Sequence, residues 1–290
     1  MKYKPQEKYE IIEKIDLSDV ISQYIIYAPF IASSAKPGHF VILMKNEKSE
    51  RIPVTLVDWD SSKGTITVII QAIGKSTADI NIMKKGDAFL NVAGPLGTPI
   101  EIEKLGTVVG IGGGVGIAEL YPIAKAFKEK GNKIISILGA RTKNLLILED
   151  ETRKISDEIL ITTDDGSYGK KGVVTDALKE LYERGEKIDA IFTIGPLIMM
   201  KYVALTSKPY NTPTFASLNP IMLDGTGMCG VCRVEIDGKF KFACVDGPMF
   251  DAHKVNFDSL MKRINAFKDH EKKSIEEFLK KHPDCKIGLH

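Results

Sequence analysis

The sequence of 290 residues has no long apolar run, few cysteines and almost no net charge. No apolar run approaches the roughly 20 residues of a membrane-spanning helix, and the stretch MKYKPQEKYE at the N-terminus lacks the apolar segment of a signal peptide. Basic residues alternate with acidic ones to a net charge of +2, so no basic surface for nucleic acid or membrane is indicated. Four cysteines do not make a disulfide scaffold, and we expect a cytoplasmic protein.

Three of the four cysteines lie close together in a glycine-rich stretch. Cys229, Cys232 and Cys244 have the spacing C-x2-C-x11-C, and Asp224 stands five residues before the first of them. Glycines between these residues allow tight turns that aim backbone N–H groups at sulfur, and a hairpin predicted over 233–243 returns the third thiolate. The plant-type [2Fe-2S] spacing is C-x4-C-x2-C followed by a distant cysteine, and the sequence reproduces it with aspartate in the first position.

Two questions about this metal site stay open at the level of residues. A structural zinc is the alternative to [2Fe-2S], although zinc sites usually combine two C-x2-C pairs, or one such pair with two histidines. The fourth ligand is either Asp224, which is in register, or Cys285, whose other interpretation is a free surface thiol. We predict the set Asp224, Cys229, Cys232 and Cys244.

The length favours two domains with small additions. Up to residue 100 the chain is typical of a small antiparallel β-barrel, because short strand-like runs are bounded by Pro, Gly, Ser or Asp. These runs cover 9–17, 20–29, 37–44, 51–60 and 64–74. Gly74, Lys75, Ser76 and Thr77 then precede a helical stretch, 78–86, where backbone N–H groups form either an anion site or an ordinary N-cap.

Strands alternate with helices over 101–217, which predicts a parallel wound sheet. The buried strand 107–111 leads into the turn Gly112, Gly113, Gly114, Val115 and Gly116 and then into a helix ending at Gly131, an arrangement that brings backbone close to a dinucleotide pyrophosphate. Further strand segments are predicted within 134–140, 152–165 and 190–196. Ligands collect at the carboxyl ends of such strands. Those ends carry Gly139, Ala140 and Arg141, then Asp164, Asp165 and Gly166, then Gly195 and Pro196.

Nucleotide preference is not decided by these residues. Arg141 stands where a ribose-binding acid is usual, and it either favours a 2′-phosphate or pairs with an acid. Met199 and Met200 are interpreted as core in preference to cofactor contacts, since methionine commonly fills gaps. Beyond 250, apolar residues at helical spacing predict two amphipathic helices.

The order of these pieces resembles the ferredoxin reductase family. The strand that begins at Arg51 is similar to that family's Arg-x-aromatic-Ser strand, with Arg one place out of register and Pro-Val replacing the aromatic. Gly94-Pro95-Leu96-Gly97 resembles its G-P-x-G turn. These departures match the electron-transfer subunits of dihydroorotate dehydrogenase. Asp224 and the tail resemble, within that group, the small subunits of NADH-dependent reduced ferredoxin:NADP oxidoreductases. Many relatives carry proline at the position of Glu119, and we expect the effect of this difference to be local.

The resemblance implies an NAD(P)H/ferredoxin oxidoreductase subunit with FAD, one [2Fe-2S] cluster and NAD(H), with NADP(H) possible. It implies a heterodimer with a larger flavin and iron–sulfur subunit that carries the ferredoxin site, and no general acid or base. The expected domains are a flavin-binding β-barrel (1–100), a nucleotide-binding domain (101–217), an iron–sulfur lobe (218–250) and a helical tail (251–290). Flavin contacts are expected at Arg51, Pro53, Val54, Thr55, Ile70, Gln71, Ala72, Gly74, Lys75, Ser76 and Thr77. Nucleotide contacts are expected at the glycine turn, at the three strand ends and at Met199.

Overall fold

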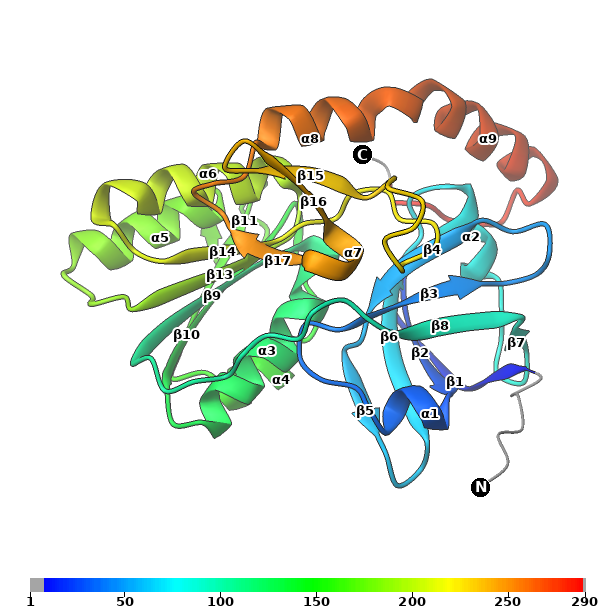
Figure 1. Ribbon diagram of the computed structural model, residues 1–290, viewed down its shortest axis with the longest axis horizontal. Coiled ribbons are helices and arrows are strands. Elements are labelled where there is room, and N and C mark those ends of the chain that lie inside the picture. The colour runs from blue at the N-terminus through cyan, green and yellow to red at the C-terminus, as the bar shows by residue number, and fades with distance from the viewer. Residues whose placement is uncertain (1–7, 289–290) are drawn as a thin grey trace.

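The computed structural model describes residues 8–288, which form two bodies with a small lobe and two helices attached. Figure 1 shows a body of strands from the first third of the chain beside a layered body of strands and helices. The expected domains 1–100 and 251–290, and the N-terminal stretch without an apolar segment, include residues outside the described range, 1–7 and 289–290. Within residues 8–288, the helices are all too short or too polar to cross a bilayer.

The first body consists of two antiparallel sheets around one core. The larger sheet has the order β5-β6-β2-β1-β7, and the smaller has the order β4-β3-β8. Their strands are β1 (Tyr9–Ser18), β2 (Ile21–Tyr27), β3 (Phe40–Met44), β4 (Arg51–Thr55), β5 (Asp58–Asp60), β6 (Thr65–Gln71), β7 (Ala88–Phe89) and β8 (Asn91–Leu96). Helices α1 (Pro29–Ala32) and α2 (Lys75–Asn81) follow β2 and β6. The antiparallel β fold predicted for this part is confirmed.

Strand β2 shows why this part of the chain forms a sheet with one buried face. Tyr24 and Ile26 are fully buried, whereas Tyr27 is 43% exposed. Because side chains alternate between faces along a strand, a register shift of one residue would place the wrong set in the core. Tyr24 and Ile26 pack with Val41 and Leu43 of β3, so the two sheets share their apolar interior.

The second body is built on a seven-stranded sheet of order β12-β11-β10-β9-β13-β14-β17, parallel except for β17. The strands are β9 (Thr107–Gly113), β10 (Lys133–Ala140), β11 (Glu158–Thr163), β12 (Lys170–Lys171), β13 (Ala190–Ile194), β14 (Thr214–Ser217) and β17 (Met249–Asp251). The helices are α3 (Ile117–Glu129), α4 (Glu149–Ile155), α5 (Val174–Glu183) and α6 (Leu197–Ser207). The predicted parallel wound sheet is confirmed.

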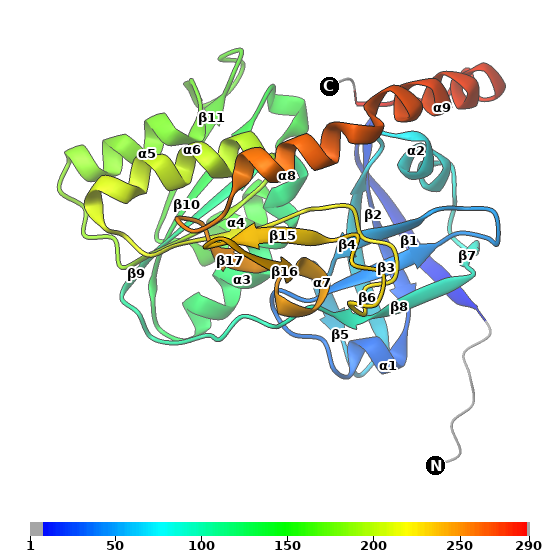
Figure 2. The same cartoon turned by 45° about the horizontal axis from the view of Figure 1, so that its top comes forward.

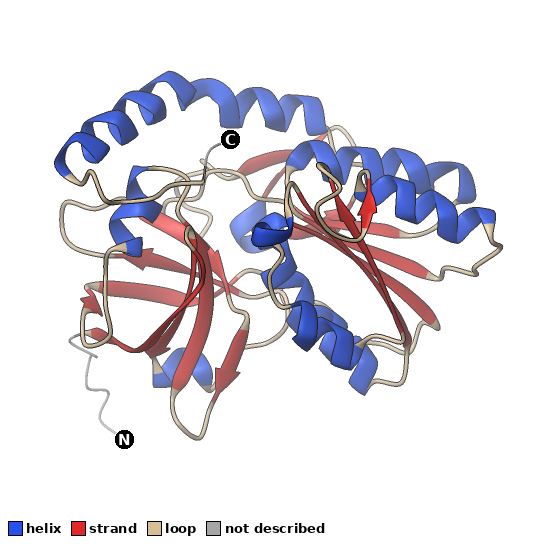
Figure 3. Ribbon diagram, turned by 180° about the vertical axis from the view of Figure 1, so that it is seen from behind, coloured by secondary structure: helices blue, strands red, loops and turns tan. Residues whose placement is uncertain are grey.

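Helices cover both faces of this sheet, as seen from behind in Figure 3. The stripe of α3 packs on one face, and α5 packs on the other. Strand β10 is therefore buried almost throughout, as expected for a central parallel strand. The segment 152–165, within which a strand was predicted, contains the end of α4 and then strand β11. Helix α4 has acidic residues in its first turn and basic residues in its last turn, which complement the helix dipole.

The C-terminal lobe contains a hairpin that joins β15 (Arg233–Ile236) to β16 (Lys239–Phe242), followed by α7 (Ala243–Asp246). The hairpin predicted over 233–243 is confirmed, and φ is 51° and 70° at its turn residues Asp237 and Gly238, as a two-residue type I′ turn requires. The lobe adds β17 to the edge of the seven-stranded sheet beside β14.

Two amphipathic helices, α8 (Phe257–Ile264) and α9 (Lys268–Lys281), follow the lobe, as predicted. Figure 2 shows them running from the second body to the first. Phe278 of α9 packs on Ala72 and Ala78 beside α2, so the end of the chain returns to the body in which the chain began.

Candidate functional site

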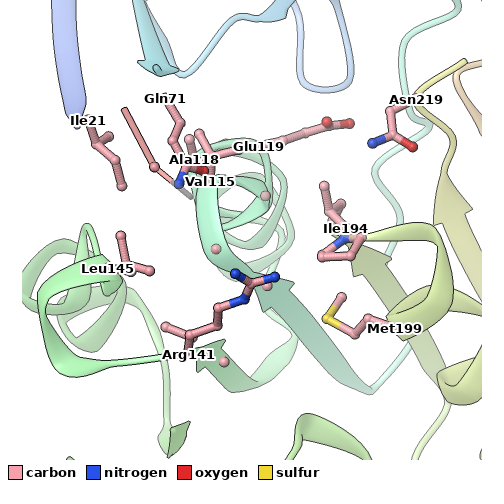
Figure 4. Close-up of a pocket in the computed structure, with 18 of the residues that line it drawn as sticks. Ile21, Gln71, Val115, Ala118, Glu119, Arg141, Leu145, Ile194, Met199 and Asn219 are labelled. Atoms are coloured by element: carbon pink, nitrogen blue, oxygen red, sulfur yellow. The ribbon is translucent and has the colours of Figure 1, made fainter. Parts of the chain in front are cut away.

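One large cavity lies where the two bodies meet (Figure 4). Its volume is about 1560 Å³, and a typical ligand pocket measures roughly 300–1,000 Å³. The first body contributes β4 and the ends of β2 and β6, while the second contributes the glycine turn and three strand ends. The cavity therefore has room for more than one extended ligand.

The glycine turn, Gly113 to Gly116, lies at the centre of this cavity between β9 and α3. A Cβ on Gly113 would lie 2.4 Å from Sδ of Met199, and one on Gly116 would lie 2.5 Å from the carbonyl oxygen of Ile194. Gly114 has φ +55°. Neighbouring groups occupy the space that side chains at Gly113 and Gly116 would need, and Gly114 has a backbone conformation that favours glycine, so the turn before α3 requires small residues.

Replacing Gly116 by alanine is expected to lower the free energy of unfolding by about 1–3 kcal/mol, because the added methyl overlaps backbone. Thermal unfolding with and without nucleotide measures this change. Gly74→Ala is the matched control, since a Cβ at Gly74 meets nothing within 4 Å. Equal unfolding temperatures for the two variants would contradict the close approach at Gly116.

The three strand ends converge on the same cavity. Its lining includes residues predicted from the strand ends: Gly139, Ala140, Arg141, Asp164, Gly195, Pro196 and Met199. Within the described chain, Gly112, Asp165 and Gly166 lie outside this lining. Asp165 instead accepts a hydrogen bond from the backbone N–H of Ser167, so it shapes the turn. Met200 is fully buried, as the core interpretation expects, whereas Met199 faces the cavity.

The predicted flavin strand lies on the opposite wall. Pro53, Val54, Thr55 and Gln71 line the cavity. The other predicted flavin contacts lie outside its lining among the described residues; they are Arg51, Ile70, Ala72, Gly74, Lys75, Ser76 and Thr77.

Two features mark the start of strand β4 and the neighbouring start of α2. Nε of Arg51 is buried and has no hydrogen-bond partner among residues 8–288. Ser76 donates a hydrogen bond to Glu50, which precedes Arg51, so the start of α2 lies beside the start of β4. The N-cap of α2 is Gly74, so the alternative of an N-cap by Ser76 or Thr77 is wrong in position. Thr77 lies at N3, and its Oγ1 accepts hydrogen bonds from the N–H groups of Ile73 and Gly74, as the N3 side chain of a capping box does.

Glu119 is a cavity residue whose role the sequence did not reveal. Its Oε2 accepts a hydrogen bond from Thr55 Oγ1 at 3.0 Å, and its Oε1 accepts a short hydrogen bond from Ser217. These partners lie 64 and 98 residues away in the sequence. The expected local effect of this residue stays a prediction. Burial raises the pKa of Glu119, and the two hydroxyl hydrogen bonds oppose that shift.

The lobe brings two of the predicted metal ligands into contact. The sulfur atoms of Cys232 and Cys244 are 3.2 Å apart and buried, whereas Cys229 is exposed. Burial, together with the neighbouring Cys232 thiol, raises the pKa of Cys244 to about 12. Asp224 accepts hydrogen bonds from the N–H groups of Thr226 and Cys229, both at 2.8 Å, and the bond from Thr226 is the main cause of its lowered pKa.

Cys285, the alternative fourth ligand, lies in a different part of the molecule from the other three cysteines. Cys285 belongs to a cluster with Ala78 and Phe278, whereas Cys232 and Cys244 pack with Leu218 and Phe250. Figure 2 shows the tail beside α2, apart from the loop that precedes β15. Over residues 8–288, no three His, Cys, Asp or Glu side chains are close enough to hold a metal ion. The ligand set therefore stays a prediction.

Comparisons with known proteins agree with this architecture. Residues 219–256 match the iron–sulfur cluster binding domain of dihydroorotate dehydrogenase B. A Thermotoga maritima protein described as a dihydroorotate dehydrogenase B (NAD(+)) electron transfer subunit homolog is 49% identical over 93% of this chain and 95% of its own length.

Solved structures extend the likeness to three dimensions. A chain from the structure of an NADH-dependent reduced ferredoxin-NADP oxidoreductase, described in work on flavin-based electron bifurcation, superposes with a TM-score of 0.89. It is 47% identical and covers 96% of this chain and 100% of that chain. A cytochrome P450 reductase from Amycolatopsis, at 19% identity and a TM-score of 0.60, covers 70% of this chain and 66% of that chain and shares the fold.

Proposed function

Because the chain belongs to the family of dihydroorotate dehydrogenase B electron-transfer subunits, we propose that it moves electrons between NAD(H), a bound FAD and a [2Fe-2S] cluster. We place it in a ferredoxin:NAD(P) transhydrogenase complex with a larger flavin and iron–sulfur subunit, which carries the ferredoxin site. The observation that carries this proposal is the central cavity, since it joins a flavin-type strand to a dinucleotide-type glycine turn.

The residues of the first body fit a flavin dinucleotide. Arg51 starts strand β4 outside the cavity lining, and its buried Nε has no partner within the described chain. A buried unsatisfied donor costs about 1–3 kcal/mol. A pyrophosphate oxygen would satisfy this donor and match the guanidinium charge. Pro53 and Val54 offer an apolar surface to the ring system, and Thr55 offers a hydroxyl.

The residues of the second body fit a nicotinamide dinucleotide. The glycine turn exposes N–H groups at the start of a helix of 13 residues, where a pyrophosphate is stabilised by the helix dipole. Arg141 lies in the cavity at the end of β10, so a 2′-phosphate and a simple ribose remain the two alternatives for its partner. We propose NAD(H), with NADP(H) as the second choice.

The lobe fits a metal centre with thiolate ligands. Cys232 and Cys244 are already neighbours, and a bound cation would stabilise their thiolate forms. Gly225, Gly227 and Gly230 have φ of 76°, 82° and 66°, so the loop around Cys229 uses conformations that favour glycine. A flavin held here would supply the conversion between two-electron hydride transfer and the one-electron transfer that a [2Fe-2S] centre requires.

Purification from native extract under anaerobic conditions, with analysis of cofactors and co-purifying chains, tests this function. We expect FAD, iron and a larger iron–sulfur flavoprotein. A dihydroorotate-oxidising partner would instead assign the chain to dihydroorotate dehydrogenase, which the names of the relatives favour. A colourless chain containing zinc, free of iron and FAD after reconstitution, would overturn the proposal in favour of a nucleotide-binding sensor.

Replacing Asp224 by cysteine is expected to retain the cluster and shift its reduction potential, because thiolate is a softer donor than carboxylate. Absorption spectra and redox titration measure this change. Cys285→Ser should leave both spectrum and potential unaltered, since Cys285 packs against α2. Loss of the cluster in Cys285→Ser would instead make Cys285 the fourth ligand.

A further inference from the structure

The segment after α9, residues 283–288, passes from the end of that helix to the central cavity. We call it the return segment, because Figure 1 shows it running back below α9 toward the middle of the molecule. Two of its residues, Ile287 and Gly288, belong to the lining of the cavity. The wall of the cavity therefore includes a part of the chain that no pattern in the sequence connected with it.

Three contacts hold the return segment against the first body. The N–H of Gly288 donates to the carbonyl oxygen of Ala72, directly after β6, at 2.7 Å. Ile287 packs in the apolar cluster that α9 forms with α2. Lys286 pairs with Asp19, in the turn before β2, at 2.9 Å, but both side chains are exposed, so this ion pair contributes little. The backbone hydrogen bond and the apolar packing therefore fix the segment beside the paired strands β2 and β6.

The return segment forms a wall between two cavities. A Cβ on Gly288 would lie 3.0 Å from Nε2 of Gln71 and 3.6 Å from Cγ2 of Val20, and both of these residues line the central cavity. The other side of the segment faces a smaller cavity of about 520 Å³, whose lining includes Asp284, Cys285 and Lys286. Because glycine has no side chain, Ile287 is the residue of this segment that offers apolar surface to a ligand in the central cavity.

The return segment lies on the flavin side of that cavity. Gln71 and Ala72, beside which it lies, are two of the predicted flavin contacts, and Figure 4 shows Gln71 and Ile21 on the same side of the cavity. Resting on the proposed function, in which FAD lies on the first body, we propose that the return segment is part of the FAD site and that Ile287 is a binding residue for the flavin dinucleotide. Its aliphatic side chain covers an apolar part of the ligand and excludes water from it, so it slows release of the ligand.

The rate at which FAD leaves the protein tests this inference. The FAD-loaded full chain is diluted into buffer without flavin, and dissociation is followed by the change in flavin fluorescence. In Ile287→Ala, we expect the dissociation rate to rise about tenfold, because the substitution withdraws apolar carbon atoms from contact with the ligand. The affinity of the FAD-loaded variant for NAD⁺ should change by less than about twofold, since the glycine turn and the strand ends that fit a nicotinamide dinucleotide belong to the second body.

Ile275→Ala is the matched control. Ile275 packs in the same apolar cluster as Ile287, and within the described chain it lies outside the lining of the central cavity. Thermal unfolding should show a similar loss of stability in both variants, whereas FAD release should be faster in Ile287→Ala alone. Equal release rates in the two variants would overturn the inference, as would weaker NAD⁺ binding with unchanged FAD release in Ile287→Ala. Should the unmodified protein bind no FAD, the proposed function itself would fail, and the inference with it.

Discussion

Serine in place of Cys232 is expected to abolish the visible absorption of the proposed iron–sulfur centre. Cys232 is buried beside Cys244, and a serine hydroxyl there ionises far less readily than a thiol, so it is a poor replacement ligand. The iron content of anaerobically purified or reconstituted protein should fall to background. The spectrum and iron analysis measure this loss directly.

FAD content provides the internal control for that experiment, since the predicted flavin wall lies on β4 and the cysteines lie in the lobe. The variant should keep its flavin and the reduction of that flavin by NADH, while electron delivery beyond the flavin stops. A full complement of iron in Cys232→Ser would refute the assignment of this cysteine. Loss of iron and flavin together would indicate a misfolded chain.

Methionine in place of Arg51 is expected to raise the dissociation constant for FAD by about 10- to 100-fold, because a hydrogen bond to a charged group contributes about 1.5–3 kcal/mol. The same change should raise the free energy of unfolding of the flavin-free protein by about 1 kcal/mol, since it removes a buried donor without a partner in the described chain. Flavin titration and thermal unfolding measure these effects.

The opposite signs of these two effects distinguish a binding residue from a structural one. Arg184→Met is the matched control, because Arg184 lies at the end of α5 and pairs with Glu158 at the surface. It should leave FAD binding intact. Unchanged FAD affinity in Arg51→Met, together with a less stable flavin-free protein, would contradict the proposed role of Arg51.

Local sequence patterns predicted most of this architecture because the signals are local in the structure as well. The turn at Gly113 to Gly116 lies between a strand and a helix, as its sequence context indicates. The hairpin at Asp237 and Gly238 has the backbone conformation that those two residues favour. Likewise, the alternation of side chains along β2 indicates which face of this strand is buried in the core.

Contacts between residues far apart in the sequence are not marked by any local sequence pattern. The hydrogen bonds of Glu119 span 64 and 98 residues, and neither periodicity nor spacing connects those positions. Cysteine spacing gave a ligand set but could not place Cys285, which α9 carries back to α2. The signal for Glu119 was that the resemblance implied proline at this position, where the sequence has an acid.

The lobe also affects how far the two bodies can move relative to each other. The two bodies are joined by the segment between β8 and β9, by the lobe, and by the consecutive helices α8 and α9. The lobe itself is fastened on both sides, through β17 beside β14 and through the N–H of Thr98, which donates to the carbonyl oxygen of Gly247 at 2.6 Å. Three separate attachments resist hinge bending more than a single linker would. We therefore expect little opening between the two bodies, so redox centres mounted on this frame would keep a nearly constant spacing.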